Sequence, residues 1–140
     1  MRVLALDLGS KRIGVAVSDR SGIIASPRSV IQRSGSRARD HKVIAQLVVE
    51  EEAELIVVGL PLNMNGSYGP MAKDAVAEAA DLASVVGVPV ETFDERLTTV
   101  TADRALMEAN ISATNRRKLV DKVAAAVMLQ AWLDGKAFRA

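Results

Sequence analysis

The chain has 140 residues, 49% of them hydrophobic and 25% charged, a balance typical of one globular domain and not of a disordered chain. It contains no cysteine, which excludes disulfides and thiolate metal sites and fits a reducing compartment. The formal net charge is +1, so overall charge points to no class of partner, and local clusters must carry any argument for nucleic-acid binding.

Three strands are predicted at the start of the chain. Residues 3–8 form an apolar run typical of a central strand buried on both faces. Residues 12–18 alternate between larger and smaller side chains, and residues 23–32 form a third strand in which Pro27 favours an edge position. The connecting turns are short, so we expect an antiparallel meander.

Helices and strands alternate after a polar loop over residues 33–39, which we expect to be mobile. Asp40 is expected to cap the next helix. The further predicted elements are a helix over 40–53, a strand over 55–60, a helix over 70–86, a strand over 88–93, and helices near 99–109 and 116–134. This order predicts a single α/β domain, a five-stranded mixed sheet flanked by helices.

Asp7 is the first candidate for chemistry. It interrupts an N-terminal apolar stretch that is too short for a signal peptide, and no stretch could span a bilayer, so we expect a cytoplasmic protein. A carboxylate within an apolar strand is costly to bury unless it is paired or bound to a cation. An ion pair with Lys11 or Arg12 is the structural alternative to a functional acid.

Two further acidic positions complete the candidate site. Asp94 and Glu95 follow the fifth strand, and ligands of open α/β sheets bind beyond the carboxyl ends of strands. Asp121 shares a helix face with Ala124 and Met128, so it lies on or beside the packed face. The alternatives are a solvated acidic turn paired with Arg96 and a surface ion pair between Asp121 and Arg117.

Together the acids suggest one metal site. Oxygen ligands without cysteine or a histidine pair suit Mg²⁺ or Mn²⁺ rather than zinc. Such ions can activate water and stabilise the leaving oxygen of a phosphodiester. The candidate catalytic and metal-binding residues are thus Asp7, Asp121 and one of the pair Asp94 and Glu95, because spacing alone leaves open which of the two is the second ligand.

Weaker signals surround the acids. The basic cluster before Asp121 could hold phosphates, and the loop after the fourth strand is rich in amide and small residues. A solvated helix face and a plain connector are the respective alternatives. His41, the only histidine, is expected to be exposed near a helix start. The predicted nucleic-acid contacts are Lys11, Arg12, Asn63, Asn65, Arg116, Arg117 and Lys118.

Four ordered segments resemble the YqgF family, also called RuvX, whose members are described as Holliday junction resolvases or pre-16S rRNA nucleases. The segments are ALDLGSKRIGVAVSD at 5–19, VVGLPLNMNGS at 57–67, DERLTT at 94–99 and VDKVAA at 120–125. The resemblance covers nearly the whole chain. It implies a ribonuclease H-like fold and metal-dependent cleavage of structured nucleic acid.

The resemblance also assigns roles to the acids. It implies Asp7 as the acid of the first strand, Glu95 as that of the Asp-Glu-Arg motif, and Asp121 as that of the final helix. RuvC-like relatives carry the second acid at the end of the fourth strand, where this chain has Gly59-Leu60-Pro61, so the role would pass to Glu95.

The family resemblance favours RNA over branched DNA as the partner. We expect no membrane partner, and we expect a monomer or weak homodimer. One rival is a phosphate-binding ATPase of the actin or hexokinase type, which needs two such domains. Another rival is a nucleic-acid-binding module without catalysis.

Overall fold

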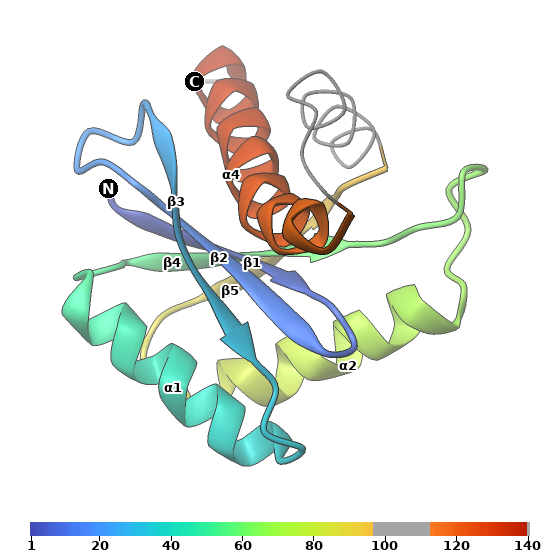
Figure 1. The fold of residues 1–140 in the computed structure, drawn as a ribbon. Helices are drawn as coiled ribbons and strands as arrows, with labels where there is room; N and C mark the ends of the chain where they lie inside the picture. The colour runs from blue at the N-terminus through green and yellow to red at the C-terminus, as the bar shows by residue number, and fades with distance from the viewer. Residues whose placement is uncertain (97–112, 140) are drawn as a thin grey trace.

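A computed structural model describes residues 1–96 and 113–139, with the side chains of the last helix described over 123–136. Figure 1 shows one sheet with helices packed on both faces. The strands are β1 (Val3–Leu8), β2 (Arg12–Ser18), β3 (Ala25–Gln32), β4 (Leu55–Leu60) and β5 (Val90–Asp94), in the order β3-β2-β1-β4-β5. The helices are α1 (Arg37–Glu50), α2 (Pro70–Ala83) and α4 (Ala113–Arg139). The predicted mixed sheet flanked by helices is confirmed.

The first three strands form the predicted meander. β1 pairs antiparallel with β2, and β2 pairs antiparallel with β3. Pro27 lies on β3, the edge strand, opposite Ala16 and next to a register irregularity. Because proline has no N–H to donate, an edge strand is where a sheet tolerates it.

The other half of the sheet is parallel. β4 runs parallel to β1, and β5 runs parallel to β4. The carboxyl ends of β1, β4 and β5 therefore lie at the same edge of the sheet. This topology brings Asp7, near the end of β1, toward residues that follow β4 and β5 in the sequence.

The side chains of β1 alternate between two cores. Leu4 and Leu6 pack in the core that includes residues of α1 and α2, and both are fully buried. Val3 and Ala5 pack in the second core, against Met128 and other residues of α4, which covers the opposite face (Figure 1). Since side chains of a strand point to alternate faces, Asp7 belongs to the α4 face.

The start of α1 differs from the prediction. Ser36 is the N-cap, and its hydroxyl accepts a hydrogen bond from the Arg39 backbone N–H at 3.2 Å. Asp40 instead accepts one from the Ser34 backbone N–H at 3.0 Å, within the segment expected to be a mobile loop. The predicted cap was therefore wrong, because Asp40 bonds the segment before the helix and does not cap it. The predicted loop is shorter than expected, because residues 37–39 belong to α1.

Other element ends shift by a few residues. The third strand begins at Ala25 rather than at residue 23, α2 ends at Ala83, β5 covers Val90–Asp94, and the final helix covers Ala113–Arg139. The helix predicted near 99–109 lies outside the described residues. In the described part of the chain, no helix is both long enough and apolar enough to cross a membrane.

Candidate active site

Asp7 lies on the central strand of the sheet, near its carboxyl end. The residue is half-buried, and its partner in the β1–β2 register is Gly14, which has no side chain. The following residues form a tight turn, in which the Gly9 N–H donates to the Arg12 carbonyl oxygen at 2.9 Å. The strand and turn together hold Asp7 at the sheet edge that carries the ends of β4 and β5.

Glu95 approaches this position from β5. It directly follows the strand, and its backbone N–H donates to the Leu60 carbonyl oxygen on β4 at 3.2 Å. Its carboxyl lies over Gly59, where a Cβ would overlap Glu95 Oε2 and come within 2.7 Å of Met128 Sδ. A glycine at the end of β4 therefore makes room for an acid supplied by the next strand.

The two carboxyl groups are in contact and perturb each other. Burial, the charges of Asp7 and Asp94, and a hydrogen bond with Asp7 together raise the pKa of Glu95 from its ordinary 4.5 to about 7, with burial the largest cause. Two like charges cannot share a desolvated site cheaply, so one keeps its proton. Near neutral pH, protonated Glu95 therefore donates to Asp7 in the metal-free protein.

The raised pKa of Glu95 predicts a stability that depends on pH. The folded protein binds the Glu95 proton up to about pH 7, whereas the unfolded chain releases it near 4.5. The favourable contribution is fully present below 4.5 and is lost as pH rises to about 7 and beyond. We expect the free energy of unfolding to fall by about 3 kcal/mol at most over this range. Urea denaturation without metal, at pH 5 and pH 8, measures it.

Glu95→Gln is the matched control for this prediction, because glutamine keeps the shape and cannot titrate. Subtracting the pH dependence of the variant from that of the wild type isolates the contribution of Glu95. Equal pH dependence in both proteins would mean that Glu95 does not hold a proton against Asp7.

The carboxylate of Asp94 forms an ion pair with Arg96. Arg96 Nε lies 2.8 Å from Asp94 Oδ2, and the Arg96 backbone N–H donates to Asp94 Oδ1 at 3.1 Å. The hydrogen bond from the Arg96 side chain lowers the pKa of Asp94. Arg96 also donates to the Met64 carbonyl oxygen at 3.1 Å, linking this turn to the loop after β4. Of the two neighbouring acids, Glu95 is therefore the one that faces Asp7.

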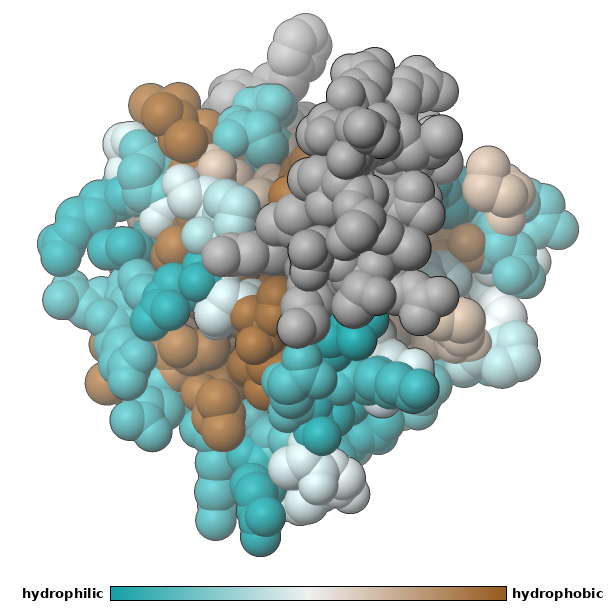
Figure 2. All heavy atoms as spheres, viewed as in Figure 1, coloured by the Kyte–Doolittle hydropathy of each residue, from teal (hydrophilic) through white to brown (hydrophobic). Residues whose placement is uncertain are grey.

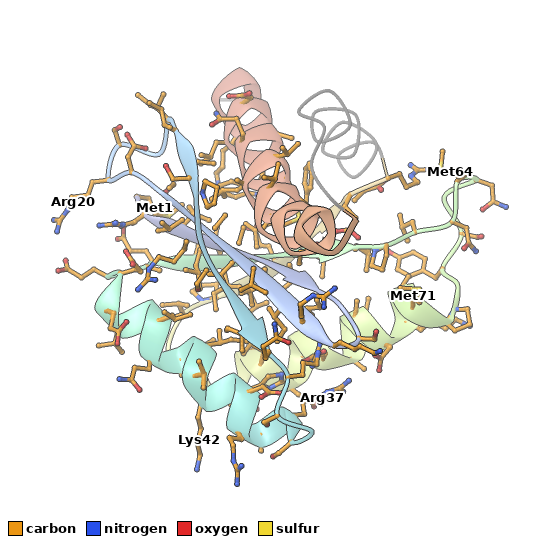
Figure 3. All side chains as sticks on the ribbon, in the orientation of Figure 1. Met1, Arg20, Arg37, Lys42, Met64 and Met71 are labelled. Carbon is orange, nitrogen blue, oxygen red and sulfur yellow. The ribbon has the colours of Figure 1, made fainter. Side chains whose placement is uncertain are left out.

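The amide side chains of the loop after β4 hold the loop together. Asn63 Nδ2 donates to Ser67 Oγ at 2.9 Å, and Asn65 Oδ1 accepts from the Ser67 backbone N–H at 3.0 Å. Figure 3 shows Met64 at the outer end of this loop, away from the sheet. Lys11, in the β1–β2 turn, is exposed, and Arg12 at the start of β2 is half-buried. These positions border the sheet edge that carries Asp7.

The remaining predicted site residues lie on α4. The backbone of Asp121 is within the helix, about two turns before Met128, but its side chain lies outside the described residues. The side chains of Arg116, Arg117 and Lys118 are likewise outside them. Among the described side chains no group of three or more metal-ligating residues gathers. The described part of the site is thus the pair formed by Asp7 and Glu95.

This pair fits a hard divalent cation. Both groups are carboxyl oxygens, the ligands that Mg²⁺ and Mn²⁺ prefer. Their mutual repulsion, which the raised pKa of Glu95 reports, is what a bound cation would relieve. The donor set is incomplete in the described residues, and Asp121 is the residue expected to complete it.

Two features of the site were not predicted from the sequence. One is Gly59, whose missing side chain admits the Glu95 carboxyl, and the other is the hydrogen bond from Arg96 to the Met64 carbonyl oxygen. The pairing of the acidic turn with Arg96, weighed as the structural alternative, is found for Asp94 and not for Glu95. His41 was also wrongly expected to be exposed: it is 2% exposed, and its Nε2 lies 2.8 Å from Glu78 Oε2.

Comparisons with known proteins agree on one family. A family model described as "RuvX: Holliday junction resolvase" matches residues 1–135. A protein of Syntrophomonas wolfei named "Putative pre-16S rRNA nuclease" is 46% identical over 135 residues, which cover 96% of this chain and 95% of the relative. A Myxococcus xanthus protein of the same name is 48% identical over 134 residues, covering 96% and 88%.

A solved structure supports the fold. RuvC of Thermus thermophilus, solved in complex with a Holliday junction substrate, superposes with a TM-score of 0.61. The two chains are 20% identical, and the match covers 98% of this chain and 96% of that one. This likeness confirms the ribonuclease H-like fold that the sequence implies.

Proposed function

The chain belongs to the RuvX family of nucleases, and we propose that it hydrolyses phosphodiester bonds in structured RNA with the help of a divalent metal ion. The relatives at 46–48% identity carry the name of a pre-16S rRNA nuclease, so precursor 16S rRNA is the proposed substrate. We propose processing of its 5′ end as the step. The observation that carries the proposal is the contact between Asp7 and Glu95 at the carboxyl edge of the sheet.

The proposed roles follow from placement. Asp7, on the rigid central strand, and Glu95, folded back over Gly59, would hold the metal from two sides, and Asp121 on α4 would supply the third carboxylate. When bound, Mg²⁺ or Mn²⁺ lowers the pKa of a water and stabilises charge on the phosphate and leaving oxygens. Glu95, whose pKa lies near 7, must release its proton for the site to load. Loading should therefore strengthen as pH rises through about 7.

Several groups around this edge would hold the RNA. Lys11 and Arg12 lie in and beside the turn after β1, and the Asn63 and Asn65 loop follows β4. Because the amides of that loop are used to hold its own turn, we propose that it presents backbone and small side chains to the substrate. Arg116, Arg117 and Lys118 are proposed phosphate contacts at the start of α4.

A cleavage assay tests the proposal. Precursor 16S rRNA fragments, with and without Mg²⁺ or Mn²⁺, are compared with a four-way DNA junction. We expect metal-dependent cleavage of the RNA, abolished by EDTA. Cleavage of the junction alone would assign the chain to branched DNA, and binding of either nucleic acid without cleavage would make it a binding module.

Replacing Arg116, Arg117 and Lys118 with alanine is expected to weaken RNA affinity and its dependence on salt. Each phosphate contact releases counterions, so the slope of log affinity against log salt should become shallower by about two to three. Fluorescence anisotropy between 50 and 200 mM salt measures both quantities. The control replaces Lys42 and Lys73, which are exposed on α1 and α2, and this change should leave the slope as it is in the wild type.

The place of action is proposed on the same basis. A nuclease for precursor rRNA works where ribosomes are assembled, so we propose a cytoplasmic protein, consistent with the absence of cysteine. We propose that it acts as a monomer or weak homodimer, which analytical ultracentrifugation would test.

Figure 2 shows hydrophilic residues around much of one face of the molecule. Nucleic acid would therefore meet polar surface on this face.

A further inference from the structure

A buried polar cluster lies on the face of the sheet opposite α4. Its centre is Glu78 of α2, which is 1% exposed, and its carboxylate accepts two hydrogen bonds from Arg33, at 3.0 and 2.9 Å. His41 of α1 contacts the same carboxylate at 2.8 Å, and an Arg37 nitrogen lies 3.7 Å away. A carboxylate this deeply buried is tolerated only when it is fully paired.

The partners keep Glu78 ionised. Burial by itself would raise the pKa of Glu78, but hydrogen bonds from Arg33 and His41 and the charges of Arg33 and Arg37 bring it below its ordinary value. Figure 3 shows Arg37 at the start of α1, close to α2 and to the turn after β1. The cluster thus joins both helices on this face to the end of β3.

Arg33 links the cluster to the turn that follows Asp7. Its Nε donates to the Gly9 carbonyl oxygen at 2.7 Å, and its backbone N–H donates to the Lys11 carbonyl oxygen at 2.9 Å. One residue therefore holds both sides of turn 9–11. The turn is tight at Gly9, where no side chain would fit, because a Cβ there would lie 2.6 Å from the Arg12 carbonyl oxygen.

Close packing does not support the turn on this side. A cavity of about 280 Å³ separates Leu8, Gly9 and Ser10 from Met71 and Ala75 of α2, and Arg33 and Glu78 line it. The Arg33 side chain bridges from α2 to the turn along this cavity. The two arginines that line the cavity, Arg33 and Arg37, are paired with Glu78, Asp74 and Asp81, so their charge is already balanced within the protein.

We propose that Arg33, held by the Glu78 carboxylate that His41 also contacts, is a positioning residue that fixes turn 9–11 and thereby the place of Asp7. Asp7 lies two residues before Gly9, so the contacts that Arg33 makes with turn 9–11 also hold the end of the strand that carries Asp7. A metal site loses function when its ligands are displaced by a fraction of an ångström. The consequence for metal binding rests on the proposed function, whereas the fixing of the turn does not.

Arg33→Lys tests the proposal because lysine keeps the positive charge but lacks the planar fork and the Nε–H. Glu78→Gln is the second variant, which releases Arg33 without changing the volume of the side chain. Arg2→Lys is the matched control, because Arg2 lies just before the first residue of β1, at the end of the strand far from turn 9–11. Its guanidinium also pairs with a carboxylate, since Arg2 Nη2 donates to Glu51 Oε2 at 3.0 Å. Three quantities are measured in each protein: the melting temperature, the amide hydrogen exchange rate of Gly9, and the affinity for Mn²⁺ by calorimetry.

We expect Gly9 exchange at least about tenfold faster and Mn²⁺ affinity about 10–100-fold weaker in Arg33→Lys, with Glu78→Gln changing in the same direction. Arg2→Lys should leave both unchanged, even if its melting temperature falls. Gly9 exchange and Mn²⁺ affinity that stay at the wild-type values, or that change equally in Arg2→Lys, would overturn the proposal. A wild-type protein that binds no Mn²⁺ would contradict the proposed function, and Gly9 exchange would still decide whether Arg33 holds the turn.

Discussion

Replacing Asp7 with asparagine is expected to abolish metal-dependent cleavage and to leave the fold intact. Asparagine keeps the volume of aspartate, so the packing of β1 should survive. The loss of a metal ligand should lower metal affinity by more than the roughly 10–100-fold that is lost when a residue supporting a ligand is changed. Without metal at pH 8, where Glu95 is ionised, the variant should melt at the same temperature as the wild type or higher, because one of two repelling carboxylates has lost its charge.

Thermal melts separate this account from a structural one. If Asp7 were one half of a buried salt bridge, its loss would cost about 3–5 kcal/mol and lower the melting temperature sharply. Asp94→Asn is the useful comparison, since Asp94 is held by Arg96 and lies one residue from Glu95. A sharp drop for Asp7→Asn, with cleavage retained by the folded fraction, would remove Asp7 from the site.

Replacing Gly59 with alanine is expected to reduce metal binding and cleavage almost as much as Asp7→Asn does. The added Cβ would occupy the space of Glu95 Oε2 and crowd Met128 Sδ, both of them ends of flexible side chains. The backbone can therefore stay in place while the Glu95 carboxyl is pushed away from Asp7. We expect Mn²⁺ affinity and cleavage to fall by at least about tenfold, with a small change in stability without metal, since alanine suits a strand slightly better than glycine.

Gly87→Ala is the control for that variant, because nothing lies within 4 Å of a Cβ at Gly87. It should bind Mn²⁺ and cut RNA at the wild-type level. Isothermal titration calorimetry and the cleavage assay measure both variants. A Gly59→Ala protein with unchanged Mn²⁺ affinity would show that Glu95 does not need the space over β4 to act.

The sequence predicted the parts of the fold that depend on local pattern. The bounds of β1, β2 and β4 match the predicted strands because continuous or alternating apolar residues mark them clearly. The start of α1 was missed because Asp40 and Ser36 are both good caps, and only the turn of the Asp40 side chain toward Ser34 distinguishes them. Such a choice depends on the three-dimensional path of the chain.

The site was predictable as a set of residue types and not as a geometry. The position of Asp7 within an apolar strand marked it, and the order of parallel strands placed Glu95 at the same edge. The role of Gly59 could not be seen, because it depends on a carboxyl that reaches back from a neighbouring strand. The burial of His41 was missed for a similar reason, since its partner Glu78 lies 37 residues away in the sequence.

Crystals soaked in Mn²⁺ test the central claim most directly. The anomalous signal of manganese locates the ion without relying on activity. We expect a peak within ligand distance of both the Asp7 and Glu95 carboxylates, on the α4 face of the sheet, at pH 8, and a weaker peak at pH 5 where Glu95 is protonated. A soaked crystal at pH 8 in which Asp7 and Glu95 still contact each other, with no manganese at either carboxylate, would contradict the assignment of a metal-dependent nuclease.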